Sequence, residues 1–379
     1  MFWRTCENDL GFKELQLRER PNAMLRFGVF GYGMIADVHA EGLAHIEGVE
    51  LIAVCGPREV GAQEFADKFG ISNVYTDPDQ LLAHDEIDGV LVDAPDAFHH
   101  DLVMRSAQAG KHIFCEKPMA VTVEEAREMY AAARQANLRT VVGFSNRWNM
   151  AANNIRKLIE DDVIGEVVHL HTQSLNPALV RSDKPRFTWR TDAKRTGTGI
   201  LGDLGSHHID LVHFLVGDIT EVSANMKTFT PQVFDDDGTP HAHDLDDDTI
   251  ILMEIANGAH GTIGVSRLGS VHSNFPVGRR HTMINGRKGG ILYENAQGWL
   301  FMPGQEGEPI PGEPPTVDKG HGGQLLAGAT RQMETFVQSV REDRAITPTF
   351  TEGLKTQEVL HAVVESSESR SWVTVQRVD

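Results

Sequence analysis

The chain has 379 residues, of which 40% are hydrophobic and 23% are charged, and its formal net charge is −19. This composition is typical of a globular protein of two domains, and the negative charge argues against nucleic acids and anionic membranes as partners. The sequence holds no apolar run of the roughly 18 residues that a membrane span needs. Three cysteines in no paired spacing indicate a reducing compartment without structural disulfides, so we expect a cytoplasmic protein.

The first 23 residues lack the apolar middle of a signal peptide, so residues 1–23 are expected to be a disordered leader. An apolar strand over residues 25–30 then runs into the motif Gly31-Tyr32-Gly33-Met34-Ile35-Ala36, where a helical pattern begins. Gly31 permits a tight turn, Gly33 lets the backbone approach a pyrophosphate, and free N–H groups at the helix start bind the anion. This context predicts a dinucleotide site, and a glycine-rich turn without a ligand is the alternative. The expected cofactor contacts here are Gly31, Gly33, Met34 and Ile35.

Strand-like runs alternate with helical patterns from residue 25 to about residue 146. This alternation predicts a doubly wound parallel sheet with right-handed crossovers, the Rossmann architecture, over residues 24–146. The expected strands are 25–30, 50–55, 89–93, 112–115 and 139–144, and the expected helices lie near 35–46, 59–69, 98–109 and 123–135.

The pattern changes after residue 146, where several strands follow one another without intervening helices. Such runs predict a second domain over residues 147–379 that is α+β, with a large open and mostly antiparallel sheet. The fold class is therefore α/β with two domains. The expected strands are 166–172, 219–228, 248–256, 259–268, 280–285, 290–295 and 371–375; the helices are 150–160, 200–215 and 352–367; and 303–322 is an exposed loop.

The end of the second strand bears on which dinucleotide is bound. An acidic residue is expected there to accept hydrogen bonds from the adenosine ribose, but this chain has Gly56. Without a carboxylate nothing repels a 2′-phosphate, and Arg58 can pair with one. Gly56 and Arg58 are therefore expected cofactor contacts and favour NADP slightly over NAD, although Arg58 as a solvated loop charge is nearly as good an interpretation.

The ends of the next two strands carry further polar side chains at the edge where doubly wound sheets bind ligands. Lys117 closes a buried strand and precedes a proline, and lysine is rarely buried unless it is used. Lys–Pro bonds can also adopt the cis form, which aims a side chain. A lysine that simply extends from a strand end to solvent is the alternative. The expected cofactor contacts at this edge are Ala94, Pro95, Asp96, His99, Glu116 and Lys117.

A glycine-bounded segment around residues 200–215 holds Asp203, His207 and Asp210. In a helix Asp203 and His207 lie one turn apart and share a face, with Asp210 three residues further on. A carboxylate and an imidazole on one face suit proton transfer from a hydroxyl group. An amphipathic helix with a surface histidine is the alternative interpretation.

Together these elements resemble the glucose-fructose oxidoreductase and inositol dehydrogenase family, usually written Gfo/Idh/MocA, over residues 25 to about 375. The resemblance rests on the glycine motif, on Glu116-Lys117-Pro118 and on the spacing of Asp203, Gly205, His207 and Asp210. It implies a Rossmann domain followed by an α/β domain whose open sheet is the interface of a homodimer or homotetramer. It also implies oxidation or reduction of a secondary alcohol on a sugar, cyclitol or sugar derivative.

Lys117 and His207 match the family's catalytic lysine and histidine, and Asp203 matches the carboxylate beside them. We expect His207 to accept the hydroxyl proton, Lys117 to stabilise the alkoxide and Asp203 to orient the groups, and the opposite assignment with a neutral lysine as base stays open. The expected substrate contacts are Lys117, Arg147, Trp189, Asp203 and His207, with Trp148 as a further pocket residue; the two tryptophans also fit a sheet-edge core.

Two other interpretations of the function stay open at this stage. An NAD-dependent glycosidase would use the same oxidation transiently, and a catalytically silent NADP-sensing regulator would bind the cofactor without turnover. Histidines and acids recur, notably in 235–248, but without a metal-binding spacing, so we expect no metal site. We interpret 235–248 as a hydrated acidic loop that enters a strand.

Overall fold

The computed structural model describes residues 24–179, 183–269, 280–312 and 323–377, so the expected leader 1–23 lies outside it. The strands of the first domain are β1 (Leu25–Phe30), β2 (Val49–Cys55), β3 (Asn73–Tyr75), β4 (Gly89–Val92), β5 (His112–Cys115) and β6 (Thr140–Val142). Within the described ranges they form one parallel sheet in the order β3-β2-β1-β4-β5-β6. This is the doubly wound order of a Rossmann domain, so the expected architecture is confirmed.

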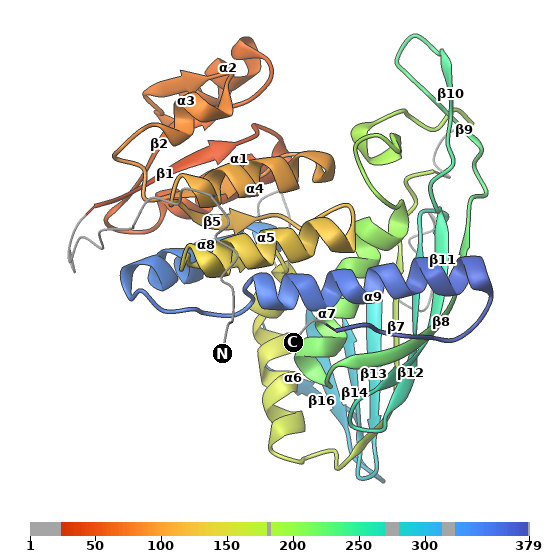
Figure 1. Ribbon diagram of the computed structural model, residues 1–379. Coiled ribbons are helices and arrows are strands. Elements are labelled where there is room, and N and C mark those ends of the chain that lie inside the picture. Colours follow the sequence, from red (N-terminus) through yellow and green to blue (C-terminus); the bar gives the residue numbers. More distant parts are fainter. Residues whose placement is uncertain (1–23, 180–182, 270–279, 313–322, 378–379) are drawn as a thin grey trace, which may run out of the picture.

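Helices cover both faces of this sheet, and apolar side chains drive their packing (Figure 1). One face carries α1 (Met34–Ala44), α2 (Glu59–Phe69) and α8 (Gly323–Arg341); the other carries α3 (Pro78–Leu82), α4 (His99–Gln108), α5 (Val123–Gln135) and the start of α9 (Phe350–Ser369). The sequence patterns do not predict α8, because it follows a Gly/Pro-rich segment. The ring of Phe336 on α8 lies 5.3 Å from that of Phe27, so this late helix completes the core of the first domain.

The second domain is built on a larger sheet. Its strands are β7 (Val167–Leu175), β8 (Ile219–Lys227), β11 (Asp248–Ile255), β12 (His260–Ser266), β13 (Arg280–Gly286), β14 (Gly290–Glu294), β15 (Gln297–Phe301), β16 (Glu308–Ile310) and β17 (Val373–Thr374). In the part of the chain that is described, their order is β16-β15-β14-β13-β7-β12-β11-β8-β17, and only β7 and β12 pair in parallel. The mostly antiparallel sheet is thus confirmed, and β16 corrects the expectation that 303–322 is all loop.

Among the described residues, helices cover only one face of the second sheet (Figure 1). The covering helices are α6 (Met150–Glu160), α7 (Ser206–Leu215) and the later part of α9. Strands β9 (Gln232–Phe234) and β10 (Pro240–Ala242) form a separate hairpin. Among the described helices, none combines the length and the apolar character that crossing a bilayer requires.

Helix α9 ties the two domains together. Leu354, near its start, packs into the core of the first domain, and Val359 and Val363 pack against the second sheet. A second tie joins the loop after β4 to the second domain, because Ala97 N–H donates to the Arg195 carbonyl oxygen at 3.1 Å. The carboxyl ends of β4 and β5 are therefore held against the segment that leads into α7.

Candidate active site

The glycine turn after β1 has the geometry that a dinucleotide pyrophosphate needs. Gly31 adopts a φ of +109°, and a Cβ there would lie 2.4 Å from the Asp93 carbonyl oxygen, so only glycine fits. A Cβ on Gly33 would meet no atom within 4 Å, so its outer side faces open space. In the part of the chain that the structure describes, no side chain caps the first turn of α1, so its N–H groups can bind an anion. These residues fit the group that the motif predicts.

The other expected cofactor residues lie around this turn. Met34 is 49% exposed, Ile35 is half-buried, and Arg58 is exposed at the end of β2. Ala94 and Pro95 are half-buried at the end of β4.

The Glu116 side chain lies beneath the loop that follows β5. One of its carboxylate oxygens accepts the Lys117 backbone N–H at 3.1 Å, and the other lies 3.6 Å from His39 Nε2. His39 in turn bonds Asp93 through Nδ1 at 3.0 Å. All three side chains are buried, so this carboxylate supports the loop from below.

Asp96 and His99 lie behind the β4 loop, and the structure does not bring their side chains to its surface. Asp96 accepts a hydrogen bond from Thr196 Oγ1 at 2.9 Å, which links the loop to the second domain. His99 is fully buried, with Nδ1 3.0 Å from the Pro118 carbonyl oxygen and Nε2 2.8 Å from that of Ala94. Carbonyl oxygens only accept, so this environment favours the protonated ring. Burial lowers its pKa, but the neighbouring Cys115 and Asp96 outweigh burial and raise the pKa to about 10.

Lys117 meets Asp203 across the junction of the two domains. The Lys117–Pro118 peptide bond is cis, as the sequence allows. Lys117 Nζ donates to the Asp203 carbonyl oxygen at 2.9 Å and lies 3.5 Å from its carboxylate Oδ1. Groups 86 residues apart in the chain are thus brought together as expected.

Asp203 lies on a widened turn rather than on the regular helix that the sequence predicts. Residues Leu201–Gly205 form a π-helical turn, and the Ser206 N–H bonds the Leu201 carbonyl oxygen before α7 begins. π turns are rare and are common at functional sites. The buried Asp246 carboxylate holds this turn by accepting the N–H groups of Gly199 and Leu201. Asp246 belongs to the segment expected to be a hydrated acidic loop, so that interpretation is wrong for this residue.

Replacing Asp246 with alanine is expected to lower the free energy of unfolding by about 1–3 kcal/mol, because two buried N–H groups lose their acceptor. It should also lower kcat, because the π turn carries Asp203. Denaturant unfolding measures the loss of stability. Asp244→Ala, an exposed acid of the same loop, is the matched control and should stay within about 0.5 kcal/mol of wild type. Equal effects of the two substitutions would contradict this role of Asp246.

Three cations surround the Asp203 carboxylate. Besides Lys117, Arg190 Nε lies 3.6 Å and Arg267 Nη2 3.8 Å from its oxygens. Burial raises the pKa of Asp203, but the three positive charges outweigh burial and hold the pKa below its usual value. The carboxylate is therefore ionised at neutral pH. No sequence motif points to Arg267 as a site residue. Arg190 follows Trp189 in the sequence, but no pattern there marks it as a partner of Asp203.

His207 is the second residue of α7, which begins directly after the π turn. Its Nδ1 is buried and has no hydrogen-bond partner among the described residues. Burial, and then the positive charges of Lys117 and Arg280, lower the pKa of His207 well below its usual value. The imidazole is therefore neutral at neutral pH and can accept a proton.

The expected substrate residues Arg147 and Trp189 are engaged with protein groups. The buried Arg147 guanidinium binds both oxygens of Asp210, with Nη2 2.7 Å from Oδ1 and Nε 2.9 Å from Oδ2. Asp210 therefore joins α7 to the segment after β6 instead of standing beside His207. The Arg190 guanidinium lies 4.3 Å from the Trp189 ring centre and so covers one face of that ring.

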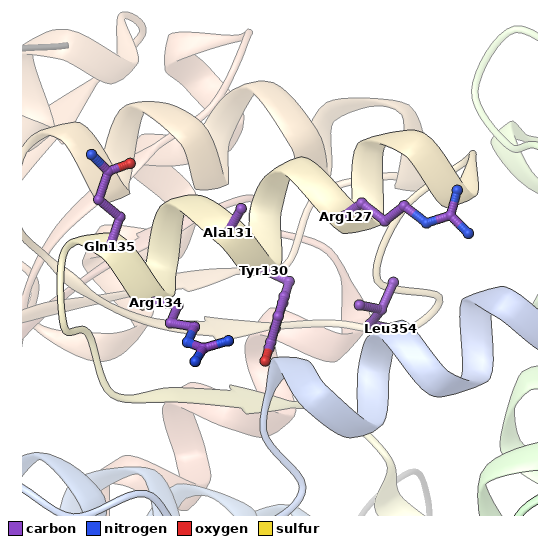
Figure 2. Close-up of a pocket in the computed structure, with 6 residues that line it drawn as sticks. All are labelled: Arg127, Tyr130, Ala131, Arg134, Gln135 and Leu354. Carbon is purple, nitrogen blue, oxygen red and sulfur yellow. The ribbon is translucent and has the colours of Figure 1, made fainter. Parts of the chain in front are cut away.

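A surface groove lies apart from these groups (Figure 2). Its volume is about 590 Å³, and it follows the seam between α5 and α9. None of the expected site residues lines it; the lining residues are Arg127, Tyr130, Ala131, Arg134, Gln135 and Leu354.

Comparisons with known proteins show the family of the chain. A family model described as an oxidoreductase family with an NAD-binding Rossmann fold matches residues 25–144, and its partner, described as a C-terminal alpha/beta domain, matches residues 156–375. Levoglucosan dehydrogenase of Pseudarthrobacter phenanthrenivorans is 28% identical over 84% of this chain and 87% of its own length. Inositol 2-dehydrogenase of Rhizobium meliloti is 29% identical over 93% of this chain and 99% of its own.

A solved structure of levoglucosan dehydrogenase in complex with NADH superposes with a TM-score of 0.83, at 25% identity. It covers 93% of this chain and 100% of its own. The two family models together span most of the sequence, in the order in which the two domains occur. The chain therefore belongs to the Gfo/Idh/MocA family of oxidoreductases.

Proposed function

We propose that this enzyme moves a hydride between a nicotinamide cofactor and a secondary alcohol or ketone carbon of a sugar, cyclitol or sugar derivative. One observation carries the proposal: Lys117 Nζ contacts Asp203 where the two domains join. His207 lies four residues beyond Asp203, and the Lys117 charge acts on its pKa. The open side of the glycine turn provides a fitting place for the cofactor.

The bound nicotinamide supplies or takes the hydride, and the three side chains handle the proton and the charge. In the oxidising direction His207 accepts the hydroxyl proton, because its imidazole is neutral. Lys117 stabilises the negative charge that develops on the oxygen. Asp203 holds Lys117 in place and balances the cations around it.

The contacts of Lys117 favour this assignment over a neutral lysine that acts as the base. Lys117 Nζ contacts the carbonyl oxygen and the carboxylate Oδ1 of Asp203, and both are acceptors, which suits an ammonium group that donates hydrogen bonds.

The Rossmann domain is of the NAD-binding kind, and we infer a preference for NADP over NAD within it. Gly56 supplies no carboxylate that would repel a 2′-phosphate, and Arg58 is exposed beside it. The buried free thiols of Cys55 and Cys115 suit a reducing cytoplasm, where we place the enzyme.

A substrate screen tests the proposed reaction. Inositols, pyranoses and anhydrosugars are incubated with NAD and with NADP, and reduced cofactor is followed by absorbance. We expect turnover with at least one of these classes, which the names of the relatives support. Tight cofactor binding without any turnover would indicate the regulator instead. Release of nitrophenol from a nitrophenyl glycoside without net reduction would indicate the glycosidase.

We also propose that two or more copies associate through the open face of the second sheet. Four large apolar side chains are exposed on its strands, from 41% to 56% each; they are Ile250, Leu252, Met283 and Phe301. Apolar side chains that gather on one exposed face mark interaction surfaces.

Leu252→Glu is expected to dissociate the assembly, because the substitution places a charge at the centre of β11 in this face. The molar mass from light scattering should fall to that of one chain. Val60→Glu, which changes an equally apolar side chain that is 71% exposed on α2, should leave the mass unchanged. An assembly that survives Leu252→Glu at low micromolar concentration would contradict this interface.

A further inference from the structure

Tyr32, which stands between the two glycines of the first turn, is wedged against two other glycines. A Cβ built on Gly56 would lie 2.2 Å from Tyr32 Cε1, and one built on Gly61 would lie 2.7 Å from Cε2. Side-chain Cβ atoms do not approach other atoms closer than about 3.0 Å. The ring therefore requires glycine at the end of β2 and again in the first turns of α2.

This position of the ring explains the glycine at the place where a Rossmann domain reads the adenosine ribose. The residue at the end of the second strand normally supplies a carboxylate to the 2′-hydroxyl. Here any side chain at position 56 would collide with the Tyr32 ring. With the ring in this position, position 56 offers no carboxylate to the 2′-hydroxyl.

The same ring places polar groups at this site. Arg58 Nε donates to the Tyr32 hydroxyl at 3.4 Å, and the guanidinium is exposed. Arg58 is also the N-cap of α2, an 11-residue helix whose first turn no side chain caps. Glu64, whose negative charge also acts on Arg58, lies further along α2. A phenol, a guanidinium and free backbone N–H groups form a set that suits a phosphate.

We propose that Tyr32 determines cofactor specificity: its ring excludes a carboxylate from position 56, and its hydroxyl and Arg58 bind the 2′-phosphate of NADP. This inference rests on the proposed use of a nicotinamide dinucleotide and adds the residue that selects between its two forms.

Binding of the reduced cofactors to the full chain tests the phosphate contact. Calorimetric titrations with NADPH and with NADH give two Kd values for each variant without relying on turnover. Wild type should bind NADPH at least 10-fold more tightly than NADH. Arg58→Gln should weaken NADPH at least 10-fold, because a charge-assisted pair is lost. Tyr32→Phe should weaken NADPH several-fold, and neither change should alter NADH binding more than about 3-fold.

A double substitution tests the exclusion of the carboxylate. Gly56→Asp alone should weaken both cofactors, because the new side chain collides with the ring. Tyr32→Ala with Gly56→Asp removes the collision and should reverse the preference, so that NADH binds at least 10-fold more tightly than NADPH. Thermal unfolding of each variant shows whether the Rossmann domain is intact.

Each outcome decides the proposal. A wild-type preference for NADH, or an unchanged ratio of the two Kd values in Arg58→Gln and Tyr32→Phe, would overturn the phosphate contact. A folded Gly56→Asp variant that prefers NADH with Tyr32 in place would overturn the exclusion. If a folded wild type bound neither cofactor, the proposed function would be wrong as well. A wild type that binds NADH but not NADPH would contradict only the specificity proposal, so the two failures are distinguishable.

Discussion

Lys117→Met is expected to lower kcat by about 10²–10³-fold while the Kd for the cofactor stays within several-fold of wild type. Methionine keeps the length of the side chain but removes the cation that lies 2.9 Å from the Asp203 carbonyl oxygen. The substrate oxygen then develops its negative charge without a positive group beside it. Steady-state kinetics on the best substrate of the screen, together with calorimetric titration of the cofactor, separates the two effects.

Lys68→Met is the matched control for this substitution. Lys68 lies on α2 of the same domain, and its side chain is 56% exposed in an ion pair with Asp37. It should keep kcat within about 2-fold, because exposed ion pairs contribute little. If Lys117→Met kept near-normal kcat, or if both variants lost activity equally, Lys117 would not stabilise the reacting oxygen.

His207→Gln is expected to lower kcat by about 10²–10⁴-fold, because glutamine cannot accept the proton. The wild-type pH profile gives a second measure of the same residue. Since the pKa of His207 lies well below its usual value, the imidazole is neutral at pH 6.5 and above. The value of kcat/KM for oxidation should therefore be flat above about pH 6.5 and fall only in more acidic solution.

His100→Gln serves as the control for His207, because its side chain lies at the surface in contact with Glu128. We expect it to keep both kcat and the shape of the pH profile. A wild-type profile whose acidic limb lay near pH 8 would contradict a neutral His207. So would a His207→Gln variant with near-normal turnover.

The motifs allowed the fold and the centre of the site to be predicted. Each of the three motifs spans only a few neighbouring residues, and sequence patterns detect such local features. The motifs are the glycine turn, the lysine before a proline and the spacing of Asp203 and His207. The order of strands in the Rossmann sheet places Lys117 at the carboxyl edge, which parallel strands share. Its contact with Asp203 of the second domain is expected from the family resemblance and not from strand order.

The partners that these groups find across the domain junction could not be predicted. Asp246 lies 45–47 residues beyond the backbone N–H groups that it binds at the π turn. Its neighbours in the sequence are acidic, so the pattern predicts an exposed carboxylate there. Arg147 was expected at the substrate, but Asp210 binds it in the core. Pairings of this kind depend on the tertiary packing of α7, which local periodicity does not encode.

The most direct test of the account is a crystal structure of the enzyme with cofactor and an oxidisable polyol bound. We predict that the reacting hydroxyl oxygen lies within about 3.2 Å of both Lys117 Nζ and a ring nitrogen of His207. We also predict that its carbon faces the nicotinamide at a distance of roughly 3–3.5 Å. A polyol whose reacting hydroxyl contacts neither side chain would contradict the assignment.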